Sequence, residues 1–219
     1  VLFRSVEGGS REYLAPLTQR FSDTIRTRMP VETILRPPGQ PVQVRFKSGL
    51  AREYDEVVIA THSDEALAML GDPTAAERSV LGALPYRDNE VILHTDARLL
   101  PKTQRAWSSW NYRLKPGSNR ATLTYNMNIL QGLDAPETFC VTLNDTDSIN
   151  PHRILGRFNY AHPQFTLEGM KAQSRWGDIN GQNGTWFCGA YWQNGFHEDG
   201  LSSGLRVAEN LCAARQMAA

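Results

Sequence analysis

The chain has 219 residues, 41% of them hydrophobic and 21% charged, and its 23 basic side chains balance 23 acidic ones. This composition is typical of a globular protein, and a chain of this length buries roughly 70% of the surface that it exposes when unfolded. The balanced charge provides no basic field for a phosphate backbone, so nucleic acid is not an expected partner.

Cysteine usage and hydropathy narrow the protein class further. Cys140, Cys188 and Cys212 lie far apart and form no C-x-x-C pair, which disfavours both a disulfide framework and a zinc site. We therefore expect a cytoplasmic protein without a metal. No apolar run reaches the roughly 18 residues of a membrane span, which leaves only peripheral membrane contact open.

The first five residues, VLFRS, belong to no structural pattern. They match the translation of GTG CTC TTC CGA TCT, the end of a common library adapter. We expect residues 1–5 to be a non-native remnant, and the reading frame to be cut upstream of Val6.

Residues 6–78 have the pattern of part of an α/β domain. The segment REYLAPLTQRFSDTI has apolar residues at nearly helical spacing, with Ser10 as the expected N-cap. Strands are expected in PVETIL, PVQVRF and DEVVIAT, and the continuous apolar run of the third predicts burial on both faces. A helix in SDEALAML, capped by Ser63, follows directly, which is the order of an α/β unit.

Residues 79–176 have a different texture. A helix expected in TAAERSVLGAL leads into short alternating segments, separated by turn formers such as KPGSN. Strands are expected in EVILHTD, WSSWNYRL, ATLTYNMN, FCVTLN and RILGRFNY. We therefore expect a second domain built on a mixed or antiparallel sheet, followed by a helix in TLEGMKAQSRW.

Residues 177–219 contain a short buried strand, expected in TWFCGAY, and a last helix. We expect this helix to run from Gly200 to about Ala214, with Asp199 as N-cap. Gly200 and Gly204 would lie on one side of it, although a glycine costs roughly 0.5–1 kcal/mol relative to alanine in a helix. Either the glycines allow packing against the strand, or they leave room for a ligand at the helix N-terminus. The apolar stripe is expected at Leu201, Leu205, Ala208 and Leu211.

The end of the chain resembles a known family. FCG followed by GFHEDGLSSGLRVAENL is similar to the C-terminal signature of the flavin-containing amine oxidase superfamily. VEGGSREYLAPL, PVETI and DEVVIATHSDEAL resemble further segments of that superfamily. More narrowly, EVILHTDARLLP, AWSSWNY, TYNMN, LQGL and CGAYWQNGFHEDGL resemble a bacterial subgroup of predicted NAD/FAD-binding proteins, which is similar to the oxidase-like region of plant cyclopropane fatty acid synthases.

The resemblance implies an α/β (α+β mixed) fold, the C-terminal part of a two-domain FAD-linked oxidoreductase. Residues 6–78 and 177–219 would belong to an incomplete FAD-binding domain, and residues 79–176 to the substrate domain. The residues that the resemblance places beside FAD are Val31, Gly189, Ala190, Gly200, Leu201, Ser202 and Gly204. Phe196 would flank the substrate face of the flavin. Tyr191 and Trp192 are either core residues or, with Phe196, the lining of an apolar substrate pocket.

The chain departs from the family pattern at two places. Ala190 stands where the family usually has an acidic residue, so one contact to the ribityl chain is unaccounted for. The G-x-G-x-x-G turn that holds a dinucleotide pyrophosphate does not occur. In the family this motif lies near the N-terminus of a longer protein, so the resemblance implies a C-terminal fragment.

No catalytic residue can be assigned from the sequence. His197, beside Glu198 and Asp199, is either a titratable group near the flavin or a histidine that steadies its loop. None of the lysines occupies a motif that matches the lysine of amine oxidases.

Three functional hypotheses follow. The first is an FAD-dependent oxidoreductase that transfers a hydride from an amine or a lipid acyl substrate to flavin. The second is a non-catalytic module whose aromatic loops in WFCGAYWQNGF hold a sugar or peptide, which requires exposed tryptophans. The third is a fragment that binds no FAD alone. The flavin hypothesis requires the aromatic residues to turn inward.

Overall fold

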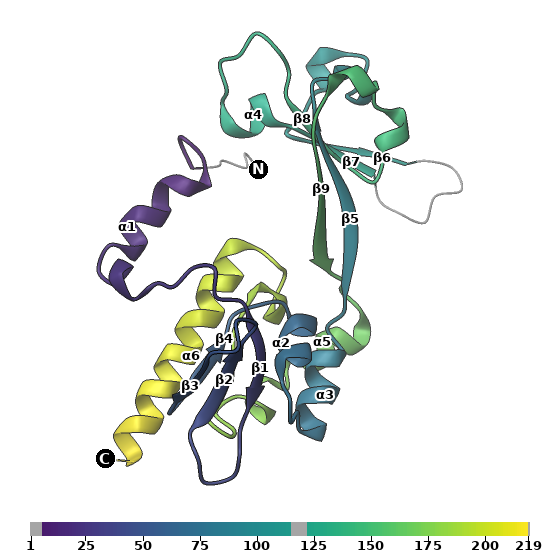
Figure 1. The fold of residues 1–219 in the computed structure, drawn as a ribbon. Helices are drawn as coiled ribbons and strands as arrows, with labels where there is room; N and C mark the ends of the chain where they lie inside the picture. Colours follow the sequence, from purple (N-terminus) through teal and green to yellow (C-terminus); the bar gives the residue numbers. More distant parts are fainter. Residues whose placement is uncertain (1–5, 115–121, 219) are drawn as a thin grey trace. The chain divides into compact units, whose positions relative to one another are not determined.

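The computed structural model describes residues 6–114 and 122–218, which form two compact units (Figure 1). Unit 1 comprises residues 6–25 and 88–161, and unit 2 comprises residues 26–87 and 162–218. The non-native remnant expected at residues 1–5 and the turn expected in KPGSN lie outside the described residues. The assignment of residues 79–176 to a substrate domain stays a prediction, as does that of the flanking segments to an FAD-binding domain.

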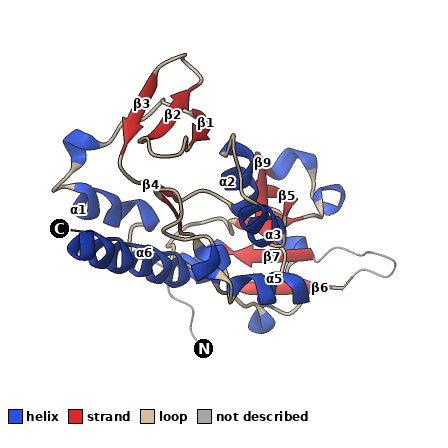
Figure 2. Cartoon of the chain, turned by 90° about the horizontal axis from the view of Figure 1, so that it is seen from below, coloured by secondary structure: helices blue, strands red, loops and turns tan. Residues whose placement is uncertain are grey.

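Unit 2 contains two small sheets and the helices around them. The antiparallel meander consists of β1 (Val31–Leu35), β2 (Val42–Phe46) and β3 (Ala51–Tyr54). The second sheet is the parallel pair of β4 (Val57–Ile59) and β10 (Thr185–Phe187). The helices are α2 (Ser63–Met69), α3 (Ala75–Gly82), α5 (Leu167–Gln173) and α6 (His197–Ala218). Helix α3 lies against both α2 and α5 (Figure 2), so the mixed α/β fold is confirmed.

Three local expectations for unit 2 are corrected. The N-cap of α2 is His62 and not Ser63, because the buried Ser63 hydroxyl donates instead to the carbonyl oxygen of Leu84 at 2.6 Å. Strand β4 is not buried on both faces, since Val58 is 44% exposed. Strand β3 was not expected, because its AREY sequence is exposed throughout and has no apolar alternation.

A buried ion pair joins the end of β1 to the turn before α3. Nε of Arg36 lies 2.9 Å from Oδ1 of Asp72, and Nη2 lies 2.9 Å from Oε2 of Glu77. Glu77 also accepts the N–H of Thr74 at 2.7 Å in the capping box of α3. Burial lowers the pKa of the Arg36 guanidinium, but the two carboxylates more than offset this, so its pKa is raised. Removal of Arg36 would leave the buried carboxylate of Glu77 uncompensated.

Unit 1 is built on an antiparallel sheet, as the sequence predicts. Its five strands lie in the order β6 (Trp110–Arg113), β7 (Thr122–Asn126), β8 (Cys140–Leu143), β5 (Tyr86–His94) and β9 (Ile154–Pro163). The pairs β6–β7, β7–β8 and β8–β5 are antiparallel. Helix α4 (Met127–Gln131) follows β7 directly.

The helix expected at residues 11–25 is broken into short pieces. Only α1 (Leu14–Thr18) is α-helical, with 3-10 turns at Ser10–Tyr13 and Ser22–Thr24. Ser10 is not an N-cap, because the first turn begins there after Gly9. Pro16 explains where α1 begins, since proline lacks an N–H and is accepted only within the first turn of a helix.

One face of the unit 1 sheet buries a chain of polar side chains. The N–H of Asp96 donates to Nδ1 of His94 at 3.0 Å, so His94 carries its proton on Nε2. That nitrogen donates to the hydroxyl of Thr142 at 2.8 Å, and Thr142 is 2.8 Å from the hydroxyl of Thr124. All four residues are buried. Burial lowers the pKa of His94, although the negative charge of Asp96 acts in the opposite direction.

This network predicts that unit 1 loses stability in mild acid. The unfolded chain binds a proton at the ordinary histidine pKa of about 6.5, whereas native His94 binds it only at lower pH. The free energy of unfolding should therefore fall as pH drops below about 6.5, by at most about 1.4 kcal/mol per pH unit for this single site. Chemical denaturation between pH 8 and pH 5, on the order of the histidine range, measures this dependence.

Two histidine variants separate His94 from the other titrating groups. His94→Asn retains an acceptor for the Asp96 N–H but cannot titrate, so the acid loss should be smaller than in the parent chain. His152→Asn removes an exposed histidine of the same unit and should leave the dependence unchanged. An equal pH dependence in the parent chain and in His94→Asn would show that another group is responsible.

Candidate functional site

The candidate site lies at the carboxyl end of β10 in unit 2. The N–H of Cys188 donates to the carbonyl oxygen of Ile59 at 3.1 Å, which continues the parallel pairing with β4. At the opposite edge, the N–H of Phe187 donates to Oδ1 of the buried Asn180 at 2.7 Å. Strand β10 is therefore held at both edges, which fixes the position of the residues that follow it.

Gly189 ends this strand in a position that admits no side chain. A Cβ at Gly189 would lie 2.5 Å from Cε1 of Tyr191, because the tyrosine ring packs over the bare Cα atom. The N–H of Gly189 donates to Oγ of the buried Ser203 on α6 at 3.1 Å. The strand end and the helix are thus joined directly.

Helix α6 begins at His197, three residues before the start expected at Gly200. Asp199 is consequently not the N-cap. Its buried carboxylate reaches back from the first turn and accepts the N–H of Phe196 at 2.8 Å and that of Asn194 at 3.2 Å. A carboxylate at this position satisfies the free amides of a helix start from inside the helix, and its charge complements the helix dipole.

The expected apolar stripe of α6 is not its buried face. Leu201 and Leu205 are 58% and 54% exposed, whereas Ser203 and Val207 are buried. The side of α6 that carries Ser203 and Val207 faces inward, because the Ser203 hydroxyl accepts the N–H of Gly189. The guanidinium of Arg206 also lies 3.9 Å from the centre of the Trp176 ring.

The two helical glycines differ in their surroundings. A Cβ at Gly200 would lie 3.9 Å from both N and Cβ of Ala190, an ordinary packing contact. A Cβ at Gly204 would have no atom of the described residues within 4 Å apart from those of the adjacent helix backbone. Packing against a neighbouring residue, Ala190, can therefore account for the glycine at position 200, but it does not account for the glycine at position 204. Ser202, between them, is half-buried.

The structure brings six of the expected FAD residues together and leaves one apart. Gly189 and Ala190 contact the start of α6, which carries the other four, Gly200, Leu201, Ser202 and Gly204. Val31 lies on β1 in the meander, half-buried against the core of unit 2. The contacts of Val31 and Ala190 give no further reason for the residue type found at either position.

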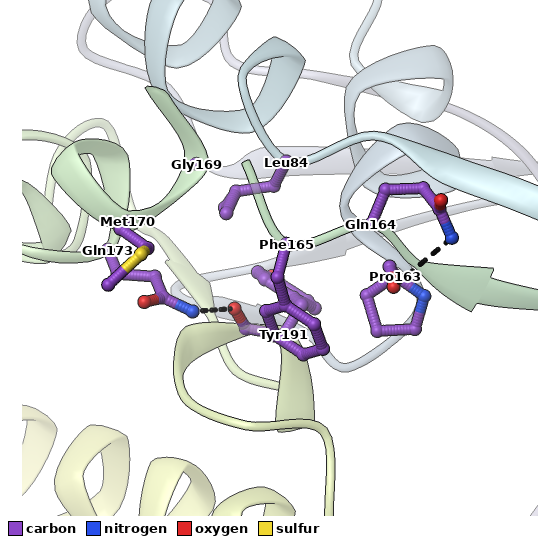
Figure 3. A pocket seen from close by; sticks show the side chains of 8 residues that line it. All are labelled: Leu84, Pro163, Gln164, Phe165, Gly169, Met170, Gln173 and Tyr191. Atoms are coloured by element: carbon purple, nitrogen blue, oxygen red, sulfur yellow. Dashed lines mark hydrogen bonds between the residues drawn. The ribbon is translucent and has the colours of Figure 1, made fainter. Parts of the chain in front are cut away.

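Of the residues expected to form a substrate pocket, Tyr191 lines a small cavity to which neither Trp192 nor Phe196 contributes. Tyr191 and Trp192 are buried in the core of unit 2, whereas Phe196 is 57% exposed. Tyr191 contributes to a small cavity of about 10 Å³, room for about one water molecule (Figure 3). Its other lining residues are Leu84, Pro163, Gln164, Phe165, Gly169, Met170 and Gln173.

Tyr191 is held by its backbone and buried at its ring. Nε2 of Gln173 donates to the carbonyl oxygen of Tyr191 at 2.9 Å, as the dashed line in Figure 3 shows. The Tyr191 hydroxyl has no hydrogen-bond partner among the described residues. Burial raises the pKa of this hydroxyl, so it stays protonated.

The tryptophans of this region argue against a surface binding module. Trp186 and Trp192 are 5% and 6% exposed, and Nε1 of Trp192 donates to the carbonyl oxygen of Phe187 at 3.2 Å. A module that holds a sugar on aromatic loop tips needs these rings at the surface. Both tryptophans are instead part of the core.

Titratable groups near the site offer no obvious nucleophile or metal centre. Burial raises the pKa of the Cys188 thiol, which keeps it protonated, and His197 is exposed at the start of α6. Over residues 6–114 and 122–218, no group of three or more His, Cys, Asp or Glu side chains could hold a metal ion. In the same part of the chain, no helix combines the length and apolar character needed to cross a membrane.

Solved structures of two enzymes share this fold. The chain is 15% identical to the CLA-producing fatty acid isomerase from P. acnes, with a TM-score of 0.57. The superposed region covers 81% of this chain and 46% of the isomerase. The chain is 12% identical to wild-type putrescine oxidase bound to putrescine, with a TM-score of 0.62. Here the superposed region covers 94% of this chain and 53% of the oxidase. The chain thus spans about half the length of these proteins.

Sequence comparison gives the family. No curated protein sequence matches this chain. The family model of the flavin containing amine oxidoreductases, however, matches residues 3–212, which is nearly the whole chain. The chain therefore belongs to the flavin-containing amine oxidoreductase family.

Proposed function

We propose that unit 2 forms part of the FAD site of an FAD-dependent oxidoreductase, with the end of β10 and the start of α6 beside the flavin and its ribityl-phosphate chain. Gly204 is the observation that carries this proposal. A glycine inside a helix is unfavourable by roughly 0.5–1 kcal/mol relative to alanine, and no described atom outside the adjacent helix backbone would lie within 4 Å of a Cβ at Gly204. A cofactor that approaches the helix backbone would account for the missing side chain.

The start of α6 has the chemistry that a phosphate or an electron-rich ring oxygen requires. The free amides of α6 belong to its first turn, which precedes Gly200, since the N–H of Gly200 donates to the carbonyl oxygen of Phe196 at 3.1 Å. This end of the helix carries about half a positive charge. Gly200 keeps the helix within contact distance of Ala190, and Ser202 adds a hydroxyl on the half-buried side. We assign the flavin end of the cofactor to Gly189, Ala190, Gly200, Leu201, Ser202 and Gly204, and the adenine end to the backbone of Val31.

Bound FAD would supply the hydride acceptor, and this chain would orient it. The Gly189–Ser203 hydrogen bond fixes the angle between strand and helix, and Phe196, at the surface beside α6, would cover the substrate face of the flavin. Unit 1 would hold the substrate. We propose either an amine, as the name of putrescine oxidase suggests, or a lipid acyl chain, as that of the fatty acid isomerase suggests.

Several features support a protein that needs more residues than these 219. The chain spans about half the length of the two solved enzymes and contains no G-x-G-x-x-G turn. We propose that the 219-residue chain does not bind FAD by itself. The three free cysteines, two of them buried, suit a reducing cytoplasm.

The first prediction concerns the longer protein encoded by the genomic reading frame that contains residues 6–219. Purified with FAD, it should be yellow, because the flavin stays bound. Gly204→Leu should abolish FAD uptake and leave the folded structure intact, since the leucine meets open space in the protein and blocks only the cofactor. Visible absorbance of the purified protein and circular dichroism measure the two effects.

Leu50→Ala serves as the matched control, because Leu50 is 43% exposed in the β2–β3 turn, away from α6. It should leave both absorbance and fold unchanged. A colourless parent protein that takes up no FAD would remove the basis of the proposal, as would a Gly204→Leu protein that binds FAD normally.

The second prediction concerns stability alone and uses the 219-residue chain. Gly204→Ala should raise the free energy of unfolding by about 0.5–1 kcal/mol, since alanine favours the helix and meets no neighbour. Gly189→Ala should lower it by about 1–3 kcal/mol, because the new Cβ overlaps the Tyr191 ring. Urea denaturation measures both values, and a destabilising Gly204→Ala would mean that packing within the chain already requires this glycine.

A further inference from the structure

The pairing register of the unit 1 sheet separates its side chains into two faces. Residues paired across antiparallel strands lie on the same face, and neighbours along a strand alternate. One row across four strands consists of Tyr112, Leu123, Leu143 and Val91. The next row on the same face consists of Trp110, Tyr125, Val141 and Leu93. We call these two rows, with their continuation on β9, the apolar face.

The apolar face continues onto the edge strand β9. A Cβ at Gly156 would lie 2.9 Å from Cε2 of Phe158 and 3.9 Å from Cβ of Leu93, so the Phe158 ring lies over Gly156 on the side of Leu93. Tyr160 stacks on Phe158 with 5.9 Å between ring centres and 3° between their planes. Aromatic side chains therefore stand at both edges of the face.

The opposite face of the sheet is buried although it is partly polar. It carries Thr124, Thr142, Asn126 and His94 together with Ile92 and Cys140, and all six are buried. An antiparallel sheet usually directs its apolar face to the core and its polar face to water. Here the hydroxyls and the imidazole are inside, held by the network around His94.

The apolar face is open to solvent. Tyr112 is 62% exposed, Tyr160 54%, Phe158 44% and Trp110 41%, while Leu123 and Leu143 between the edges are half-buried. Val91 alone in the two rows is buried. No Asp, Glu, Lys, Arg or His occurs in either row. A contiguous apolar surface without charge marks a place where another body is meant to cover it.

We propose that this face is an internal interface of a longer polypeptide, covered by residues that a full-length member of the family carries outside these 219. The argument rests on family membership and does not depend on the flavin site. The chain spans 46% and 53% of two solved relatives, so a protein of that length has about as many residues again to place.

The breadth of the face favours a polypeptide layer over a small molecule. Five strands at about 4.8 Å spacing extend over roughly 19 Å. A second layer of secondary structure packed on a sheet of this width would bury the whole face. The short N-terminal helix α1 and the residues after it also expose apolar side chains to solvent. Leu14 and Leu17 on α1, and Phe21 beyond it, are 49–64% exposed.

Hydroxyl-radical footprinting tests this interface, because side-chain oxidation follows solvent exposure. The 219-residue chain, at two concentrations, is compared with the longer protein from the genomic reading frame. Tyr54, 40% exposed in unit 2, and Tyr191, 1% exposed, are the internal standards. Tyr112 and Tyr160 should oxidise at least as fast as Tyr54 in the short chain. In the longer protein both should slow to nearly the rate of Tyr191.

A matched pair of variants gives a second measurement. Tyr112→Lys should lower the Tm of the longer protein and leave that of the 219-residue chain unchanged, because only the longer protein buries this position. Tyr54→Lys should change neither Tm through this interface. These results do not depend on flavin, so a colourless but protected protein would support the interface and contradict only the proposed function.

Four outcomes would overturn the inference. Unchanged oxidation of Tyr112 and Tyr160 in the longer protein would show that its additional residues do not cover the face. Protection of the short chain that increases with concentration would mean that a second copy covers it. Protection of the short chain at both concentrations would mean that the 219 residues suffice. A genomic reading frame without further residues would leave no occupant.

Discussion

The contact between the end of β10 and helix α6 is the constraint on which the candidate site depends. It requires a bare Cα atom at Gly189, over which the Tyr191 ring packs, and a short polar side chain at Ser203, which receives the Gly189 N–H at 3.1 Å. At the strand edge opposite β4, the side chain of Asn180 accepts the N–H of Phe187, which fixes the position of the strand relative to its surroundings. The position of Gly204 and of the helix amides follows from this junction. The flavin proposal is therefore a statement about backbone geometry more than about any catalytic side chain.

The two units solve the burial of polar groups in different ways. Unit 2 encloses a charged group, Arg36, between two carboxylates, whereas unit 1 encloses a neutral hydrogen-bonded chain around His94. Both arrangements are costly when incomplete, because an unpaired buried polar group loses its hydration without compensation. In unit 1 this choice leaves apolar side chains facing water. That surface is the strongest indication that the fold of unit 1 is completed by residues from elsewhere.

Local patterns predicted most elements but not their ends or faces. Nine of the strand segments and the helices α2, α3, α5 and α6 follow from alternation, helical period and turn formers. The caps at Ser63 and Asp199 were misassigned, because both side chains bond to groups that the local sequence does not reveal. The outward-facing Leu201 and Leu205 depend on how α6 packs against Gly189. The register that places Tyr112 and Tyr125 on the open face is set by pairing between distant segments, which periodicity alone does not determine.

Amide chemical shifts of the glycines on α6 would test the central claim most directly. In the longer protein with 15N-labelled glycine, addition of FAD should shift the signals of Gly200 and Gly204, identified by alanine substitution. Gly39 and Gly49, in turns of the meander, should remain unchanged. FAD binding that leaves the signals of Gly200 and Gly204 in place would contradict the account, because the cofactor would then lie away from the start of α6.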